Sequence, residues 1–153
     1  MDSVEQLVKK LIEKKLSIAF MESASGFANA ITNVEGASEI LQFSAVTYSN
    51  EFKMKMGVPQ EVIEKYTVYS RKTAREMARS ISDFSHSSIG VGITGKLNRV
   101  DKYNLHGEDH VVFVAVYYQN TFYEFTYLAQ EKKRKDNKEA LISFVLQKIL
   151  ALL

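Results

Sequence analysis

The chain of 153 residues contains no cysteine, one proline and three histidines. The lack of cysteine excludes a disulfide scaffold, a thiolate zinc site and a cysteine nucleophile. No apolar run approaches the roughly 18 residues that a membrane-spanning helix needs, and the polar first residues show no signal peptide. The net charge of +2 is too small to indicate nucleic-acid binding by itself. We therefore expect a cytoplasmic protein that binds neither nucleic acid nor membranes.

Hydrophobic residues make up 46% of the chain and charged residues 25%, which is ordinary for a globular protein. A chain of this length can bury a real hydrophobic core. The sequence has no internal repeat, no linker and no low-complexity segment. We therefore expect residues 1–153 to form a single domain.

Helical and strand patterns alternate along the first two thirds of the chain, and a hairpin and a helix follow. This order predicts a three-layer α/β/α domain with a mixed sheet of about five strands. The expected strands are 16–20, 43–48, 88–94, 111–118 and 121–128, and the expected helices are 3–12, 27–31, 38–41, 51–56, 59–65, 71–84 and 136–152.

Local signals mark where some of these elements begin or turn. Asn50 and Ser70 are polar residues of the kind that cap helix N-termini, and each precedes an expected helix. Two residues, Gln119 and Asn120, separate the last two strand patterns, which predicts a hairpin turn. These residues therefore predict two helix starts and one turn.

Residues 90–96, Gly-Val-Gly-Ile-Thr-Gly-Lys, match both G-x-G-x-x-G and G-x-x-x-x-G-K. The second pattern needs Ser or Thr after the lysine, where this chain has Leu97. The first needs its glycines after a strand, but Gly90 and Gly92 fall inside one. We interpret both glycines as sites where a helix or a ligand packs closely on a strand. Thr94 and Gly95 end that strand and are candidates to line a site.

Two polar clusters carry weaker signals. His106 and His110 flank Glu108 and Asp109, but their spacing matches no common ligand set, so we expect a solvated loop and neither a metal nor another cofactor. The basic run 132–135 has two interpretations. It is either a solvated helix start or a phosphate contact, for which arginine is better suited than lysine.

Ser38, Tyr48 and Lys53 place a hydroxyl, a phenol and an amine within sixteen residues. Serine becomes a nucleophile when a neighbour removes its proton, and lysine can do so if its pKa is lowered. A tyrosine can relay the proton or hold the geometry. These residue types are common on protein surfaces, so their spacing alone indicates catalysis only weakly.

Short motifs around these residues give them a context. They read Met-Glu-Ser-Ala-Ser-Gly-Phe at 21–27, Gly-Ala-Ser at 36–38, Tyr-Ser-Asn-Glu-Phe-Lys at 48–53, Gly-Val-Pro at 57–59 and Ile-Thr-Gly at 93–95. Their order resembles A-E-S-C-T-G-G, G-[AS]-S, Y-S-N-E-x-K, G-V-P and I-T-G in the C-terminal domain of the competence/damage-inducible CinA proteins. Stand-alone members of that family (PncC type) are nicotinamide mononucleotide deamidases. The resemblance spans about residues 3–150.

The resemblance implies hydrolysis of the carboxamide of nicotinamide mononucleotide, which yields nicotinate mononucleotide and ammonia without a metal. By analogy, Ser38 is the nucleophile, Lys53 the base that activates it, and Tyr48 an aid to proton transfer. The family analogy also implies a homo-oligomer with a nucleotide-like small molecule as its partner. The implied substrate-binding residues are Ser23, Ser25, Gly26, Thr94, Gly95 and, for the phosphate, Arg134.

The chain departs from the family pattern around this trio. Gly95 is followed by Lys-Leu-Asn-Arg in place of the family's Ile-Ala-Gly-Pro, and the usual double glycine is Gly26-Phe27. These changes put the substrate in question more than the fold. Three alternatives therefore stay open: a deamidase of nicotinamide mononucleotide, a nucleotide-binding or regulatory relative that has lost activity, and a deamidase of another amide.

Overall fold

The computed structural model describes residues 2–23, 26–97, 110–130 and 133–153. Five strands form one sheet in the order β2-β1-β3-β4-β5. Strand β1 is parallel to both of its neighbours, β2 and β3, whereas the β3–β4 and β4–β5 pairs are antiparallel. The sheet is therefore mixed, as predicted. The strands are β1 (Ile18–Glu22), β2 (Leu41–Val46), β3 (Ile89–Gly95), β4 (Val111–Tyr118) and β5 (Thr121–Leu128).

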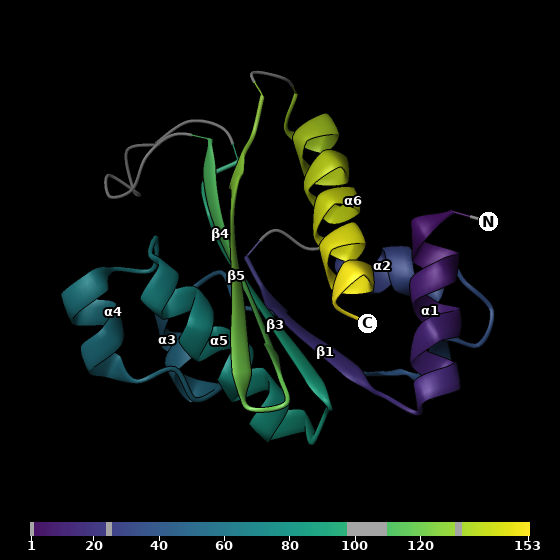
Figure 1. Cartoon of the computed structure of the whole chain (residues 1–153). Coiled ribbons are helices and arrows are strands. Elements are labelled where there is room, and N and C mark those ends of the chain that lie inside the picture. The colour runs from purple at the N-terminus through teal and green to yellow at the C-terminus, as the bar shows by residue number, and fades with distance from the viewer. Residues whose placement is uncertain (1, 24–25, 98–109, 131–132) are drawn as a thin grey trace.

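Helices cover both faces of this sheet (Figure 1), which confirms the three-layer α/β/α prediction. No helix in the described ranges is long and apolar enough to cross a bilayer. On one face lie α1 (Ser3–Lys14), α2 (Phe27–Thr32) and α6 (Arg134–Leu152), and on the other lie α3 (Asn50–Lys55), α4 (Gln60–Tyr66) and α5 (Arg71–Ser85), while the short 3-10 helix η1 (Ala37–Glu39) leads into β2.

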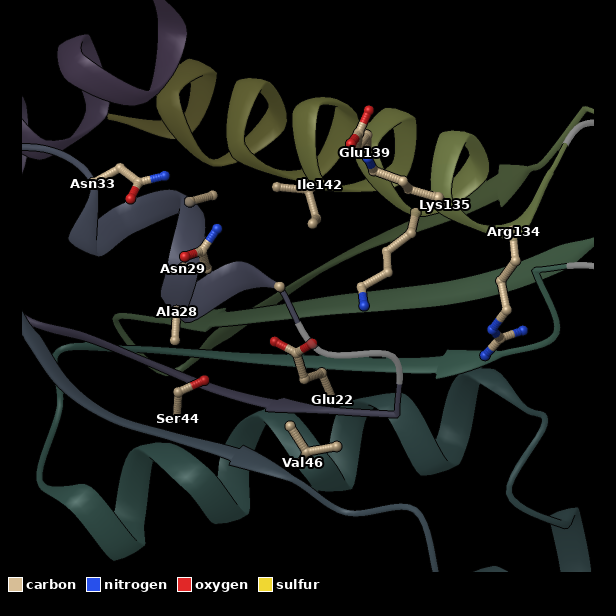
Figure 2. Close-up of a pocket in the computed structure, with 13 residues that line it drawn as sticks. Glu22, Ala28, Asn29, Asn33, Ser44, Val46, Arg134, Lys135, Glu139 and Ile142 are labelled. Carbon is tan, nitrogen blue, oxygen red and sulfur yellow. The ribbon is translucent and has the colours of Figure 1, made fainter.

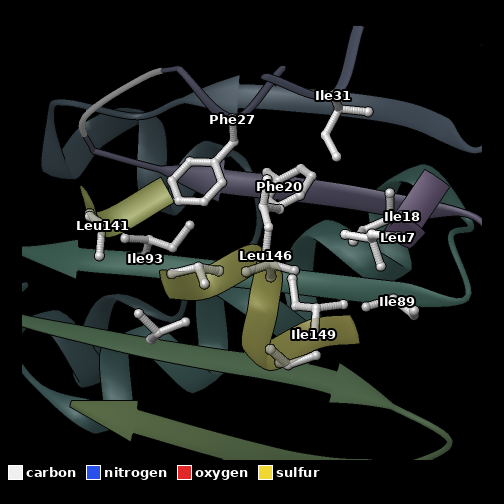
Figure 3. Packing of buried hydrophobic residues seen from close by; sticks show 14 of the residues in the cluster. Leu7, Ile18, Phe20, Phe27, Ile31, Ile89, Ile93, Leu141, Leu146 and Ile149 are labelled. Atoms are coloured by element: carbon white, nitrogen blue, oxygen red, sulfur yellow. The ribbon is translucent and has the colours of Figure 1, made fainter. Parts of the chain in front are cut away.

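The larger apolar core lies between the sheet and α1, α2 and α6 (Figure 3). Phe20 of β1 stacks on Phe27 of α2 with ring centroids 5.2 Å apart, and Ile149 of α6 is fully buried in the same cluster. Because side chains alternate along a strand, the next residue, Met21, points to the other face and packs in the cluster under α5. Each large apolar side chain buried in this way contributes about 2 kcal/mol.

Two glycines let α5 approach β3 very closely. A Cβ on Gly90 would lie 2.1 Å from the carbonyl oxygen of Ala78, and one on Gly92 would lie 2.2 Å from that of Ala74. Neither position accepts a side chain unless the helix moves away. The glycines thus lie inside the strand, as predicted, where they allow close helix packing, and they do not form a phosphate-binding turn.

Changing Gly92→Ala should destabilise the fold. The new methyl group would overlap the backbone of α5, and overpacking of this kind costs about 1–3 kcal/mol. Chemical denaturation should show that loss in the free energy of unfolding. Thr126→Ala on the exposed face of β5 is the matched control and should change it by less than about 0.5 kcal/mol. Equal stability of the Gly92→Ala variant and the native chain would mean that the helix is not held this tightly.

The local signals were mostly right. Ser70 caps α5 by accepting a hydrogen bond from the backbone N–H of Thr73 at 3.1 Å. Positive φ angles at Gln119 and Asn120, 52° and 57°, form the predicted hairpin turn. The prediction for Asn50 was wrong. Ser49 has the extended backbone of a cap and accepts from Phe52 N–H at 3.1 Å, so Asn50 is the first helical residue.

Candidate active site

Polar side chains gather where the three parallel strands end. Glu22, the last residue of β1, lies opposite Val46 of β2 and Ile93 of β3, so the residues that follow, Ser23, Thr47 and Thr94, lie side by side at the carboxyl edge. Parallel α/β sheets bind ligands at this edge.

The hydroxyl groups at this edge are not used equally. The Oγ of Ser23 and the Oγ1 of Thr47 are buried without a hydrogen-bond partner in the described part of the chain. Thr94 is also buried, but its hydroxyl donates to the carbonyl oxygen of Val68. Leaving a buried hydroxyl unsatisfied costs free energy, and such groups are often found where a ligand completes the bonding. Ser23 and Thr47 are therefore available to a bound molecule.

Lys53 is the unusual charge of this region. It lies in the last turn of α3, only 1% exposed, and its Nζ donates to the carbonyl oxygen of Thr47. In the described ranges, no carboxylate forms an ion pair with it. Burial therefore lowers the pKa of Lys53 from 10.5 to about 8. At pH 7 about one molecule in ten then carries a neutral amine, against about one in 10³ for a free lysine.

The other two members of the predicted trio lie at different ends of β2. Tyr48 follows Thr47 at the carboxyl end and is 67% exposed. Ser38 lies in η1, exposed to solvent, ahead of the first residue of β2. The six residues of β2 extend over roughly 20 Å. Within one chain, the fold thus brings Tyr48 and Lys53 to the same end of the strand and leaves Ser38 at the other.

A pocket of about 920 Å³ opens next to this edge, between α2, α6 and β2. Figure 2 shows the side chains of Arg134 and Lys135 reaching from α6 toward the strands, where Glu22 lies below them. Ser44 and Val46 of β2 form the opposite wall. The rim is rich in cations, so the pocket suits a molecule with an anionic group. Its size is in the range of small-molecule sites.

The remaining predicted residues fall in or beside this pocket. Gly26 lines it and, with a φ of 113°, precedes α2. Arg134 joins the pocket to a small cavity of about 20 Å³ that it shares with Ser23, Thr94 and Gly95. That cavity has room for about one water molecule. Ser25 lies outside the described residues.

Sequence reasoning missed three residues of this region: Glu22, Thr47 and Lys135. Glu22 belongs to the motif at 21–27, but nothing in the sequence indicates its deep burial or its place on the pocket wall. Thr47 follows the apolar run of β2, and its role in holding Lys53 through a backbone carbonyl leaves no trace in side-chain patterns. Lys135 was named only as part of a basic run, and the start of α6 at Arg134 is what directs it inward.

Only one member of the histidine cluster, His110, lies in the described part of the chain. His106, Glu108 and Asp109 lie outside the described residues, and the ring of His110 approaches the carbonyl oxygen of Leu97 at 3.1 Å. Among residues that the structure describes, no group of three His, Asp or Glu side chains could hold a metal ion.

A protein-family model matches the whole chain, and individual relatives match part of it. Residues 1–153 match the family model described as CinA C-terminal domain. A putative competence-damage inducible protein of Alkaliphilus oremlandii (strain OhILAs) is 44% identical over 97 residues, which cover 61% of this chain and 24% of that protein. A protein of the same description from Clostridium beijerinckii is 37% identical over 121 residues, covering 76% and 29%. The chain thus spans about a quarter of the length of the curated relatives it matches.

Solved structures agree with the architecture. A competence or damage-inducible protein from Enterobacter asburiae superposes with a TM-score of 0.89 at 27% identity, over 98% of this chain and 95% of that one. A competence/damage inducible protein from Agrobacterium tumefaciens gives a TM-score of 0.85 at 24% identity, over 99% and 96%. The second likeness shows the fold alone.

Proposed function

Because this chain belongs to the CinA C-terminal domain family, we propose that it is an amidohydrolase that converts nicotinamide mononucleotide into nicotinate mononucleotide and ammonia. Buried Lys53 is the observation that carries the proposal. Its pKa of about 8 makes it a usable base near neutral pH. A surface lysine has no such property, and burying a cation that pairs with no described carboxylate has a stability cost that a catalytic role would explain.

The chemistry begins when Ser38 Oγ attacks the carboxamide carbon and Lys53 Nζ takes the hydroxyl proton. Collapse of the tetrahedral intermediate breaks the C–N bond, and Lys53 returns the proton to the leaving ammonia. Water then attacks the acyl-serine ester, gives a proton to Lys53, and releases the carboxylic acid with regeneration of the serine. Tyr48 relays protons at the same edge. The hydroxyl of Ser23, which is buried without a partner in the described structure, donates to the developing oxyanion.

The pocket accounts for a nucleotide substrate. A phosphate bound by Arg134 and Lys135 on α6 would direct the rest of the molecule toward Glu22 and the ends of the strands. Guanidinium groups bind phosphate oxygens in pairs, which fixes orientation as well as affinity. The substrate amide then lies at the edge where Ser23, Thr47 and Lys53 meet.

The direct test is ammonia release and nicotinate mononucleotide formation by the purified protein. Turnover of the nucleotide, with little on simple amides, would support the proposal. A panel containing nicotinamide, its riboside and unrelated amides would reveal a deamidase of another substrate. Calorimetry that finds tight nucleotide binding without hydrolysis would contradict the proposal and identify a binding protein that has lost activity.

Arg134→Gln should weaken binding of the phosphate without harming the chemistry. Loss of a charged hydrogen bond of about 1.5–3 kcal/mol predicts a rise in KM of about 10-fold to 100-fold with little change in kcat. The riboside, which lacks phosphate, should be affected much less. Lys148→Gln is the matched control because Lys148 lies farther along α6, over the rings of Phe125 and Phe144. An equal effect on nucleotide and riboside would show that Arg134 does not bind the phosphate.

A further inference from the structure

The proposed nucleophile and its base cannot meet within one chain. The first residue of β2, Leu41, pairs with the first residue of β1, and its last residue, Val46, pairs with the last. Ser38 precedes Leu41, whereas the Nζ of Lys53 is bonded to Thr47 just after Val46. The pairing with β1 holds β2 extended, so the two groups stay roughly 20 Å apart, the length of six strand residues.

β2 is an edge strand, and its outer side pairs with no other strand in the described structure. Natural proteins protect such edges with charged residues, proline or a covering element. Residues 41–46, Leu-Gln-Phe-Ser-Ala-Val, contain no charge and no proline. The neighbouring strand β1 is buried at every position, whereas Phe43 and Val46 of β2 remain 37% and 48% exposed. This edge is open to another strand.

Exposed apolar side chains lie on both faces of this edge strand, since Phe43 faces α5 whereas Val46 lines the pocket beside α2 and α6. Among the described residues, five of the seven large exposed hydrophobics lie there. Phe43 contacts Phe84 of α5 with ring centroids 5.3 Å apart, and both remain partly open to solvent. Clusters of this kind mark surfaces that a protein partner covers. We call them the β2 patch: Phe43, Val46, Tyr48, Phe52 and Phe84.

A second copy of the chain could cover the β2 patch and also bring a Ser38 close to Lys53 and Tyr48. If β2 pairs antiparallel with the same strand of a second copy, Leu41 lies opposite Val46 and the twofold axis passes between Phe43 and Ser44. That pairing brings the end of β2 that follows Ser38 in one copy next to the end that precedes Tyr48 in the other. Parallel pairing would instead place Ser38 beside Ser38. Only the antiparallel arrangement brings the separated groups together.

We propose that the catalytic site is shared between two copies, in which Ser38 of one copy acts with Lys53 and Tyr48 of the other across paired β2 strands. This inference rests on the proposed function for its chemistry, but its geometry stands on the strand alone. The symmetric dimer holds two such sites, one at each end of the β2–β2 pair.

Mixing two inactive variants tests the shared site. Co-expressed Ser38→Ala and Lys53→Met chains with different tags yield a purified heterodimer in which one site carries both substitutions and the other carries neither. That heterodimer should recover about half of native turnover, because one of its two sites is intact, while each homodimer stays inactive. An inactive heterodimer, with an active native protein, would overturn the shared site.

A second measurement does not depend on activity. The chain has no cysteine, so Ser38→Cys and Tyr48→Cys chains each carry a single thiol. A short bismaleimide should link the two variants to each other much more than Ser38→Cys links to itself. Ser38→Cys mixed with Leu128→Cys, on the opposite edge strand, is the matched control and should not link. If the two variants link but the native protein hydrolyses no amide, the paired β2 strands are supported and only the proposed function is refuted.

The oligomeric state completes the test. Light scattering should give a dimer or a multiple of it for the native chain and half that mass for Phe43→Glu, because two charges would then lie beside the twofold axis. Leu128→Glu introduces the same negative charge on the β5 edge and should leave the mass unchanged. A native monomer, or a dimer indifferent to Phe43→Glu and without the cross-link, would contradict the proposal.

Discussion

Changing Ser38→Ala or Lys53→Met is expected to lower kcat/KM by at least about 10³-fold, and the double variant should lose no more than either single one. The reason is that nucleophile and base act in one step: without the base the hydroxyl is not activated, and without the hydroxyl the base has nothing to activate. Steady-state ammonia release from saturating and subsaturating substrate measures all four proteins.

Two controls guard this result. Lys55→Met changes a lysine two residues farther along α3. The ammonium of Lys55 is exposed and pairs with Glu51 at 3.1 Å. This variant should leave turnover within about twofold, since surface ion pairs contribute little. Lys53→Met should fold at least as stably as the native chain, because it removes a buried cation.

The Ser23→Ala variant tests whether Ser38 or Ser23 is the nucleophile. Ser23 lies at the carboxyl edge of the same chain as Lys53 and has a buried hydroxyl. If it serves the oxyanion, its loss should cost about 10²-fold, less than loss of the nucleophile. Full inactivation by Ser23→Ala together with normal turnover by Ser38→Ala would refute both Ser38 as nucleophile and the shared site.

The fold was predictable because its signals are local and repeated. The apolar stripe of α5, the continuous apolar run of β4 and the alternation along β5 identify those elements. Gly90 and Gly92 lie in an otherwise apolar run, which placed them in a strand rather than in a turn. The Asn50 cap failed because two adjacent residues have similar capping ability, and only the backbone angles at Ser49 decide between them.

The site was harder to predict, since its properties depend on distant parts of the chain. The burial of Lys53 requires α3 to fold back onto the edge of the sheet, and a helix of six residues has too short a pattern to reveal which face is covered. Ser38 and Lys53 look close in a motif, yet one extended strand separates them. A strand converts sequence proximity into distance, and whether that strand is an edge follows only from the sheet order.

The pH dependence of catalysis should follow Lys53. With a pKa of about 8 for the buried amine, kcat/KM should rise about tenfold per pH unit below pH 8 and level off above it. A fall of about 50-fold from pH 8 to pH 6 is therefore expected, because the amine is half neutral at pH 8 and about 1% neutral at pH 6. A rate profile on a substrate without ionisable groups in this range measures it. A profile that is flat between pH 6 and pH 8 would contradict a role for Lys53 as the base.

Titration of Lys53 should also make the free energy of unfolding depend on pH, and the direction of that change follows from the lowered pKa. Between pH 8 and pH 10.5 the unfolded chain keeps a proton on Lys53 that the folded chain has lost. The free energy of unfolding must then rise with pH across that window, by about 3 kcal/mol in total for a shift of this size. Other groups titrate there as well, so denaturation is compared between the native chain and Lys53→Met. The difference should be largest below pH 8 and shrink toward pH 10.5, whereas a constant difference would mean that burial leaves the lysine proton unaffected.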